Sequence, residues 1–376
     1  MKKNVLFILG SLNRGGAERV ISVISRQLAE EGYGVTILLL LQYKVDYEMH
    51  KDIRIIDLSG NDKSRLLHTF FWIKNIRKHV KESNPDSIVA FFARINILTI
   101  LACLGLKKKL IISERNDPQH DGRGFMVNVA TRVLYPLADK VVFQTKRVSS
   151  YFPYLSNATI IFNPISVSSV SKNTNLKKIV TVGRLTVQKN QKLLIESFSE
   201  VLKKYPNIIL EIYGDGEKRE ELKYIIKTLG VSNNVIFKGN ILNVHEAIAD
   251  AGLFVLSSDY EGLSNALMEA MMMGLPCIST TCAGSDELIS DGKNGILVPV
   301  GDKEKMTTAI NLLLNNDVLR LSLGKQAKID SENYSVDKIY KKWKERAHRP
   351  HTVSRKIGRR RRARLRDKSP CLHAFP

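Results

Sequence analysis

Two cations in one short loop are the first residues that could do chemistry. Arg184 and Lys189 lie in the stretch 183–190, directly after an apolar segment that predicts a strand. An arginine can bind two oxygens at once and a lysine acts as a point charge, so the pair suits a diphosphate group. A solvated loop without a ligand is the alternative interpretation.

Two glutamates lie further along the same half of the chain. Glu261 precedes a predicted helix, and Glu269 follows inside it after seven intervening residues. Ser264 is of a type that caps helices, which leaves the amides of the first turn free for an anion. Paired glutamates are also typical of sugar hydrolysis by acid and base, but the cationic loop favours a phosphorylated donor instead.

A glycine pair marks the third candidate site. Gly15 and Gly16 lie between the first predicted strand and the first predicted helix. Glycines there allow a ligand to approach the backbone, and the helix N-terminus offers free amides to an anion. The spacing is not that of G-x-G-x-x-G, so nicotinamide or flavin binding is not supported. A purely structural turn explains the glycines equally well.

Short apolar runs alternate with amphipathic stretches along most of the chain, which predicts a βα repeat. In the first half the expected strands are 5–9, 35–41, 53–57, 88–92, 110–113, 141–144 and 160–162, with helices near 17–30, 66–81, 95–104 and 127–137. In the second half the expected strands are 179–182, 208–213, 235–238, 253–256 and 277–279, with helices near 193–204, 217–229 and 264–273.

This rhythm predicts an α/β fold of two Rossmann-like domains, each a doubly wound parallel sheet, because strands that are apolar on both faces are buried between helices. Ligands of such folds bind at the carboxyl ends of the strands, so we expect a cleft between the two domains. We expect the first domain at 1–165, a linker at 166–178, the second domain at 179–345 and a tail at 346–376.

The formal net charge of +21 is unevenly distributed. The first 165 residues hold 24 Lys and Arg against 14 Asp and Glu, residues 166–342 hold 22 against 21, and residues 343–376 hold 12 against 2. The last segment has no apolar periodicity and contains four consecutive arginines from Arg359. It is either an unstructured end or a segment that binds polyanions without sequence preference.

Composition excludes several protein classes. With 376 residues, 44% hydrophobic and 25% charged, the chain is neither disordered nor fibrous. No apolar run reaches the roughly 18–20 residues that span a bilayer. The four cysteines are scattered without zinc-site spacing, which favours the reduced cytoplasm.

In these motifs the chain resembles the retaining nucleotide-sugar glycosyltransferases of family 4, which have two facing Rossmann-like domains (the GT-B fold). The resemblance covers about residues 1–345, with the landmarks in the family's order. The segments that carry it are Gly15-Gly16, Gly183-Arg184 with Lys189-Asn190, Gly214-Asp-Gly216, Phe237-Lys-Gly239 and Glu261-x7-Glu269 followed by Gly274-Leu-Pro276.

The resemblance implies catalytic roles for three residues. Arg184 and Lys189 would neutralise the donor diphosphate as it leaves, and Glu261 would touch the transferred sugar. The family's retaining chemistry passes the acceptor's proton to the departing phosphate oxygen, which needs no protein nucleophile. The chain has no Asp-x-Asp, so neither a metal nor another cofactor is expected, and the two cations would take over the metal's electrostatic role.

The resemblance also implies a set of donor-binding residues. Glu269 would hold the ribose hydroxyls, and the glycine loop would close over the donor. The amides of the helix start would bind phosphate, and one strand end would border the base. In order along the chain, the implied donor-binding residues are Gly15, Gly16, Arg184, Lys189, Lys238, Gly239, Leu263, Ser264, Asn265 and Glu269.

One position departs from the family pattern. Many relatives carry a histidine after the strand at 110–113, and this chain has Arg115 there. An arginine cannot act as a base, but it can hold a phosphate or position the acceptor. Arg115 is therefore the candidate on the acceptor side.

The acceptor is expected in the basic first domain. The predicted helix 66–81 combines aromatic bulk with several cations, which suits an anionic membrane or a lipid-linked diphosphate. A helix that simply packs on the sheet is the alternative. Relatives that build envelope glycans make a polyprenyl-diphosphate acceptor reasonable.

These observations favour one function over two others. We expect a metal-independent retaining glycosyltransferase that moves a sugar from a UDP-sugar to a lipid-linked or surface oligosaccharide. It would lie at the inner face of the plasma membrane and bind no specific nucleic acid. The alternatives are a nucleotide-sugar epimerase on the same fold and a non-enzymatic polyanion-binding protein.

Overall fold

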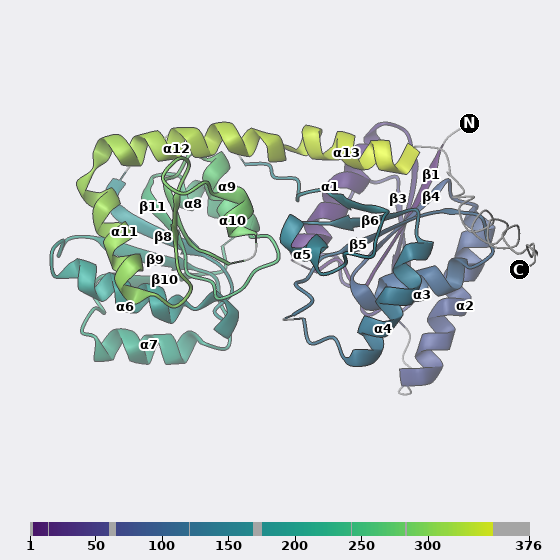
Figure 1. Ribbon diagram of the computed structural model, residues 1–376, viewed down its shortest axis with the longest axis horizontal. Coiled ribbons are helices and arrows are strands. Elements are labelled where there is room, and N and C mark those ends of the chain that lie inside the picture. The colour runs from purple at the N-terminus through teal and green to yellow at the C-terminus, as the bar shows by residue number, and fades with distance from the viewer. Residues whose placement is uncertain are drawn as a thin grey trace, which may run out of the picture.

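Two parallel sheets, each covered by helices on both faces, make up the structure, which is a computed structural model (Figure 1). It describes residues 3–13, 15–59, 65–119, 121–167, 175–241, 243–282 and 284–348. The expected class, two Rossmann-like α/β domains, is confirmed.

The first domain has a seven-stranded sheet in the order β3-β2-β1-β4-β5-β6-β7. Its strands are β1 (Asn4–Leu9), β2 (Gly34–Leu39), β3 (Ile53–Asp57), β4 (Ser87–Phe91), β5 (Lys109–Glu114), β6 (Lys140–Phe143) and β7 (Ala158–Ile160). Its helices are α1 (Gly16–Glu30), α2 (Arg65–Ser83), α3 (Ala93–Cys103), α4 (Phe125–Leu134) and α5 (Lys146–Ser150).

Strand β1 shows why this sheet is buried on both sides. Val5, Phe7 and Leu9 belong to the apolar cluster on the face that α1 covers. Leu6 and Ile8 belong to the cluster on the opposite face, under α2, α3 and α4. Successive side chains of a strand point to opposite faces, so an apolar run without alternation requires helices on both.

The second domain has a six-stranded parallel sheet in the order β10-β9-β8-β11-β12-β13. Its strands are β8 (Asn175–Val182), β9 (Ile209–Tyr213), β10 (Val235–Gly239), β11 (Ala251–Leu256), β12 (Cys277–Thr280) and β13 (Ile296–Val298). Its helices are α6 (Gln191–Leu202), α7 (Arg219–Thr228), α8 (Val244–Ile248), α9 (Asn265–Met272), α10 (Ser285–Leu288), α11 (Lys303–Asn315) and α12 (Asp317–Ser331).

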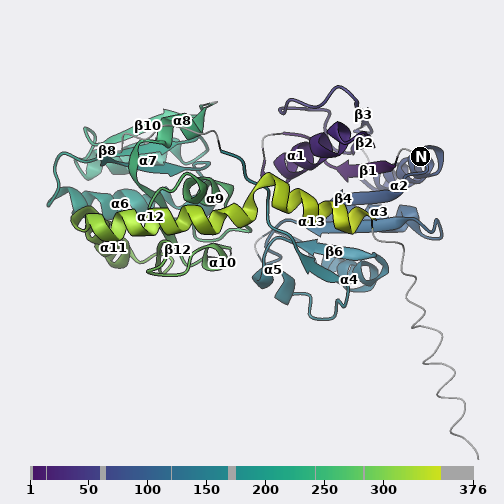
Figure 2. The same cartoon turned by 90° about the horizontal axis from the view of Figure 1, so that it is seen from above.

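The last helix returns to the first domain. Helix α13 (Val336–His348) continues the line of α12 across the molecule (Figure 2). Its Ile339, Tyr340 and Trp343 are buried in the same cluster as α1 and the face of β1 that it covers. The range 179–345 expected for the second domain therefore includes a helix that packs on the first.

The other expected boundaries shift by a few residues. Strand β8 begins at Asn175, inside the expected linker 166–178, of which residues 168–174 lie outside the described part of the chain. Of the expected tail 346–376, the first three residues end α13, and residues 349–376 lie outside the described part. Among the described helices, none is long and apolar enough to cross a membrane.

The two domains touch closely around the cleft. A Cβ placed on Gly262 would lie 3.1 Å from the backbone oxygen of Arg115, so the second-domain loop lies directly against the first domain. The amides of Lys146 and Arg147, at the start of α5, each donate to the Glu287 carboxylate of α10 at 2.8 Å. The cleft is therefore narrow, with direct contacts on two sides.

Candidate functional site

A cavity of about 530 Å³ lies between the carboxyl ends of the two sheets. Loops after β1, β4 and β5 form its first-domain wall, and loops after β8 and β11 form the opposite wall. Nine of the predicted residues line it: Gly15, Gly16, Arg115, Arg184, Lys189, Glu261, Leu263, Ser264 and Asn265. The parallel strands bring these distant segments together at one cleft, as expected of doubly wound sheets.

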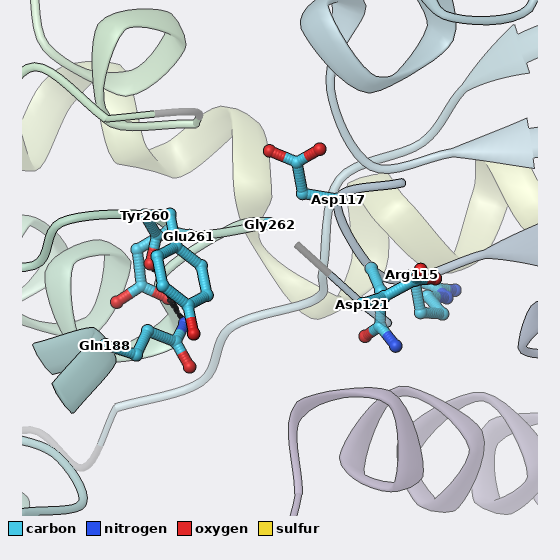
Figure 3. A pocket seen from close by; sticks show the side chains of 8 residues that line it. Arg115, Asp117, Asp121, Gln188, Tyr260, Glu261 and Gly262 are labelled. Atoms are coloured by element: carbon cyan, nitrogen blue, oxygen red, sulfur yellow. Dashed lines mark hydrogen bonds between the residues drawn. The ribbon is translucent and has the colours of Figure 1, made fainter. Parts of the chain in front are cut away.

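An adjoining hollow of about 200 Å³ extends from this cavity (Figure 3). In Figure 3, side chains of the first domain lie on one side and side chains of the second domain on the other. The labelled first-domain residues are Arg115, Asp117 and Asp121, and the second-domain residues are Gln188, Tyr260, Glu261 and Gly262.

Lys189 and Glu261 form an ion pair at the cavity wall. Lys189 ends a 3-10 turn (Val187–Lys189), after which Asn190 adopts a left-handed backbone and caps α6. Glu261 is buried, and its Oε1 also accepts a hydrogen bond from Ser258 at 2.7 Å. The sequence showed no acidic neighbour for the cationic loop, but the fold supplies one from the loop after β11.

Arg184 has a different environment from Lys189. Its guanidinium is exposed and lines the cavity, and it has no hydrogen bond or ion pair with the described side chains. Its charge acts on Glu18 of the first domain across the cavity. One of the two predicted cations is therefore paired within the second domain, and the other is available to a ligand.

Glu269 is held by a residue of the other domain. Its buried carboxylate forms an ion pair with Arg19 of α1, and His245 Nε2 lies 3.1 Å from its Oε2. Burial alone would raise the pKa of Glu269, but hydrogen bonding by His245 and the charge of Arg19 outweigh it and lower that pKa. Sequence reasoning missed both partners, because neither stands in a recognisable motif.

The start of α9 contacts the glycine loop. Ser264 caps the helix, its hydroxyl lying 3.4 Å from the amide of Leu267. A Cβ on Gly16 would lie 3.2 Å from Asn265 Nδ2, so the first-domain loop approaches the helix start closely. The hydroxyl of Tyr47 donates to the carbonyl of Gly15 at 2.8 Å and accepts from the amide of Gly15 at 3.1 Å, which holds the loop at that residue.

Three of the predicted donor-binding residues, Lys238, Gly239 and Glu269, do not line this cavity. Lys238 lies at the end of β10, with its Nζ 3.5 Å from Glu211 Oε1. Gly239 follows with a φ of +66°, and its carbonyl accepts a hydrogen bond from the amide of Gly214 at 2.8 Å. Glu269 is likewise set back behind the cavity wall.

Arg115 is buried between aromatic rings. Its guanidinium carbon lies 4.3 Å from the ring centre of Phe91 and 5.6 Å from that of Trp343. Burial lowers the pKa of Arg115 to about 9. Its Nη1 donates to Asn163 Oδ1 at 3.0 Å, and Asn163 Nδ2 donates to Asn265 Oδ1 at 2.6 Å. Arg115 is thus connected through Asn163 to the start of α9.

Within the described part of the chain, no group of three or more His, Cys, Asp or Glu side chains is arranged to hold a metal ion. The positive groups at the cavity are the side chains of arginine and lysine and the amides at the start of α9. These groups suit an anionic ligand.

The two halves of the chain match two glycosyltransferase models. Residues 14–165 match the model described as Glycosyltransferase Family 4, and residues 164–330 match the one described as Glycosyl transferases group 1. The lipopolysaccharide core biosynthesis glycosyltransferase LpsE of Rhizobium meliloti is 32% identical over 326 residues, which cover 83% of this chain and 89% of that protein.

The chain belongs to glycosyltransferase family 4. A second relative, an α-1,4-N-acetyl-D-galactosaminyltransferase of Campylobacter jejuni that is named for an oligosaccharide on diphospho-undecaprenol, is 28% identical, with 90% of this chain and 96% of that protein covered. Among solved structures, HepE of Anabaena in complex with UDP has a TM-score of 0.76 at 18% identity, with 92% and 99% of the two chains covered. The family 4 enzyme therefore has the GT-B fold, and its activity is glycosyl transfer.

Proposed function

We propose that this family 4 enzyme transfers a sugar from a UDP-sugar to a lipid-linked or surface oligosaccharide, with retention of configuration and without a metal ion, in bacterial polysaccharide synthesis. The observation that carries the proposal is the convergence of Arg184, Lys189, Glu261 and the start of α9 on one cavity between the domains. Several relatives are named for envelope polysaccharides, including LpsE and the amylovoran enzyme of Erwinia amylovora.

Electrostatics of the leaving group would dominate the rate. The bond between sugar C1 and the phosphate oxygen breaks, and the acceptor oxygen forms the new bond to C1 on the same face. The acceptor's proton goes to the departing phosphate oxygen, so atoms and charge balance without a protein nucleophile. Arg184, Lys189 and the amides at Leu263, Ser264 and Asn265 would hold the negative charge that develops on the diphosphate.

Donor binding would exchange two ion pairs seen in the structure. Lys189 would leave Glu261 for the diphosphate, and Glu261 would then accept hydrogen bonds from the transferred sugar. The ribose hydroxyls would replace Arg19 at Glu269, with Lys238 and Gly239 near the base. Gly15 and Gly16 would let the first-domain loop close on the donor.

An exposed apolar surface of the first domain supports a membrane-bound acceptor. On α4, Phe125 and Met126 are 79% and 78% exposed, and Val129 and Val133, further along the same helix, are exposed as well. On α2, Phe70 is exposed whereas Ile76 is buried against the sheet. The helix expected at 66–81 therefore packs on the sheet with one face and exposes an aromatic ring to solvent on another. Aromatic groups together with the exposed lysines of α2 suit an anionic membrane at its cytoplasmic face.

Vesicle flotation tests this surface. Binding to vesicles of anionic lipid should fall about tenfold or more in Phe125→Ser/Met126→Ser, because each buried side chain contributes about 1.5–3 kcal/mol. Val318→Ser, which changes an equally exposed residue of α12, should leave binding unchanged. Equal binding of all three proteins would exclude α4 from membrane contact.

The transfer reaction itself is tested with UDP-glucose, UDP-galactose and their two N-acetylamino forms, each with lipid-linked oligosaccharides from a bacterial membrane extract. Proton NMR of the product should show the donor's α configuration, and excess EDTA should leave the rate unchanged. A β product would contradict retention, and abolition by EDTA would contradict metal independence.

A further inference from the structure

A second cavity, of about 360 Å³, lies in the first domain next to the cavity between the domains. Glu18, Phe92 and Asn116 line both cavities. These three side chains come from α1, from the β4–α3 junction and from the loop after β5, so no single motif contains them. They mark the place where one cavity passes into the other.

Phe92 has a backbone conformation that a phenylalanine rarely adopts. Its φ is +76° and its ψ is 140°, a region where a Cβ causes strain. The backbone is held there on both sides, since its amide donates to the Ser113 carbonyl at 3.1 Å and its carbonyl accepts from the Asn96 amide at 2.8 Å. Such strain is concentrated at functional sites, and here it accompanies a half-buried aromatic ring at the cavity junction.

Glu18 places a carboxylate at the same junction. Its Oε2 folds back against the glycine loop, so close to Gly15 that a Cβ on that glycine would displace the carboxylate. Burial raises the pKa of Glu18, although its own backbone amide and the charges of Arg115 and Arg184 oppose the shift. The carboxylate is therefore partly removed from water in a position that a ligand can reach.

We infer that Glu18, Phe92 and Asn116 form the subsite for the accepting sugar residue. The apolar face of a pyranose ring packs on an aromatic ring, and its hydroxyls hydrogen-bond to carboxylate and amide groups. The subsite adjoins the cavity that contains Arg184 and Lys189, so a sugar held there faces the donor. This inference rests on the proposed function.

The rest of the first-domain cavity suits the carrier of that sugar. Arg94 lines this cavity and is exposed. Its guanidinium is therefore accessible to an anionic group such as a diphosphate. Leu41 and Val127 line it as well, and Val127 belongs to α4, whose Phe125 and Met126 are exposed to solvent. A lipid-linked acceptor could therefore extend from the subsite along a cationic group to the apolar surface of α4.

Saturation-transfer NMR of glycoside binding tests the subsite. The probes are the octyl glycosides of glucose, galactose, N-acetylglucosamine and N-acetylgalactosamine, each with and without UDP. At least one glycoside should bind wild type. Its Kd should rise at least about tenfold in Phe92→Gly and in Glu18→Gln, because each variant removes one recognition group. Phe92→Tyr keeps the ring and should bind within a factor of about three.

Two controls separate recognition from folding. Glycine accommodates the φ of +76° without strain, so the midpoint of Phe92→Gly should stay within about 4 °C of wild type. Tyr224→Ala and Glu304→Gln change an exposed aromatic and an exposed carboxylate of the second domain and should bind glycosides as wild type does.

The outcomes distinguish this inference from the function on which it rests. Glycoside binding that is equal in wild type and both variants, or absent from wild type, would overturn the subsite while UDP binding stands. Absence of UDP binding in wild type, measured separately by calorimetry, would overturn the proposed donor site instead.

Discussion

The two halves of the cleft differ in how their residues are assembled. In the second domain, Arg184 and Lys189 share one loop, and Glu261 and Ser264 share another. In the first domain, the residues at the cavity come from separate elements, such as Glu18 on α1 and Arg115 after β5. The cleft residues of the second domain therefore come from short motifs that can be recognised in the sequence, whereas those of the first domain are brought together by tertiary packing.

The halves also differ in charge and in accessible groups. The second domain is nearly neutral, and its key lysine is paired with Glu261. The first domain is strongly basic, and it sends Arg19 across the cleft to Glu269. Each half therefore satisfies some of its charges internally or through the other domain, and a donor that binds as proposed would replace those contacts.

Among the changes considered, removal of the Lys189 side chain should have the largest effect on the transfer rate. Lys189→Ala should lower kcat by about 10²–10³, because the diphosphate loses a cation where charge develops. Steady-state transfer rates check this, with Lys192→Ala on α6 as the control, since Lys192 is exposed and lies 3.8 Å from Glu196 one turn along the same helix. Full activity of the Lys189 variant would contradict the proposal that the second domain binds the donor diphosphate through this lysine.

Removal of the ion pair between Arg19 and Glu269, which joins the two domains, should have a smaller effect and should strengthen UDP binding. Arg19→Ala frees Glu269 for the ribose, so the Kd for UDP measured by calorimetry should fall about fivefold. The midpoint of unfolding should fall by about 2–4 °C, since a buried carboxylate loses one partner. Arg26→Ala, on the same helix but exposed, should change neither quantity. Unchanged UDP affinity in Arg19→Ala would show that Arg19 does not compete with the donor.

The carboxylates of Glu269 and Glu18 should contribute to stability with opposite pH dependence. The lowered pKa of Glu269 means that its ionised form stabilises the fold above the ordinary value of 4.5, a contribution lost as pH falls through the lowered pKa. The raised pKa of Glu18 means that its ionisation costs stability as pH rises above 4.5.

Urea unfolding of Glu269→Gln and Glu18→Gln between about pH 3 and about pH 7, a range that extends well below the ordinary value of 4.5, checks this pair of carboxylates. At neutral pH the Glu269 variant should be less stable than wild type and the Glu18 variant more stable, and both differences should shrink on acidification. Differences of the same sign would mean that the two carboxylates do not experience the opposite environments described here.

Removal of the basic tail should leave ligand binding in the cleft between the two domains unchanged. Residues 349–376 contain ten Lys and Arg and follow the end of α13, so their deletion keeps that helix whole. Heparin retention should be largely lost, with a weaker salt dependence, while calorimetry should give the wild-type Kd for UDP. A changed UDP affinity would connect the tail to the site.

Sequence patterns predicted the positions of most strands, but they did not predict which helices pack across the two domains. Apolar runs located strands such as β4 and β11 within two residues at each end, because strands buried on both faces have few polar positions to interrupt them. The short strand β13, with three residues, was missed. The return of α13 to the first domain was also missed, because periodicity shows that a helix has an apolar face but not which sheet covers it.

Site prediction followed the same division. Loop motifs next to strand ends predicted that Lys189, Glu261 and Ser264 would lie at one cleft, and all three line the cavity, because parallel strands bring their carboxyl ends to one edge. Arg19 and His245 could not be found, since their contact with Glu269 depends on the relative position of elements far apart in the sequence. The strain at Phe92 is likewise a tertiary effect, invisible in a run of two phenylalanines.

The most direct test of the account is a thermal-shift comparison of UDP, GDP and ADP with wild type, Lys189→Ala and Glu269→Ala. A ligand that binds only the folded state should raise the wild-type midpoint by about 5 °C at a hundredfold excess over Kd. We predict this shift for UDP alone and its loss in both variants. A shift that persists in the variants, or no shift with any of the three nucleotides, would contradict a nucleotide-diphospho-sugar site between the two domains.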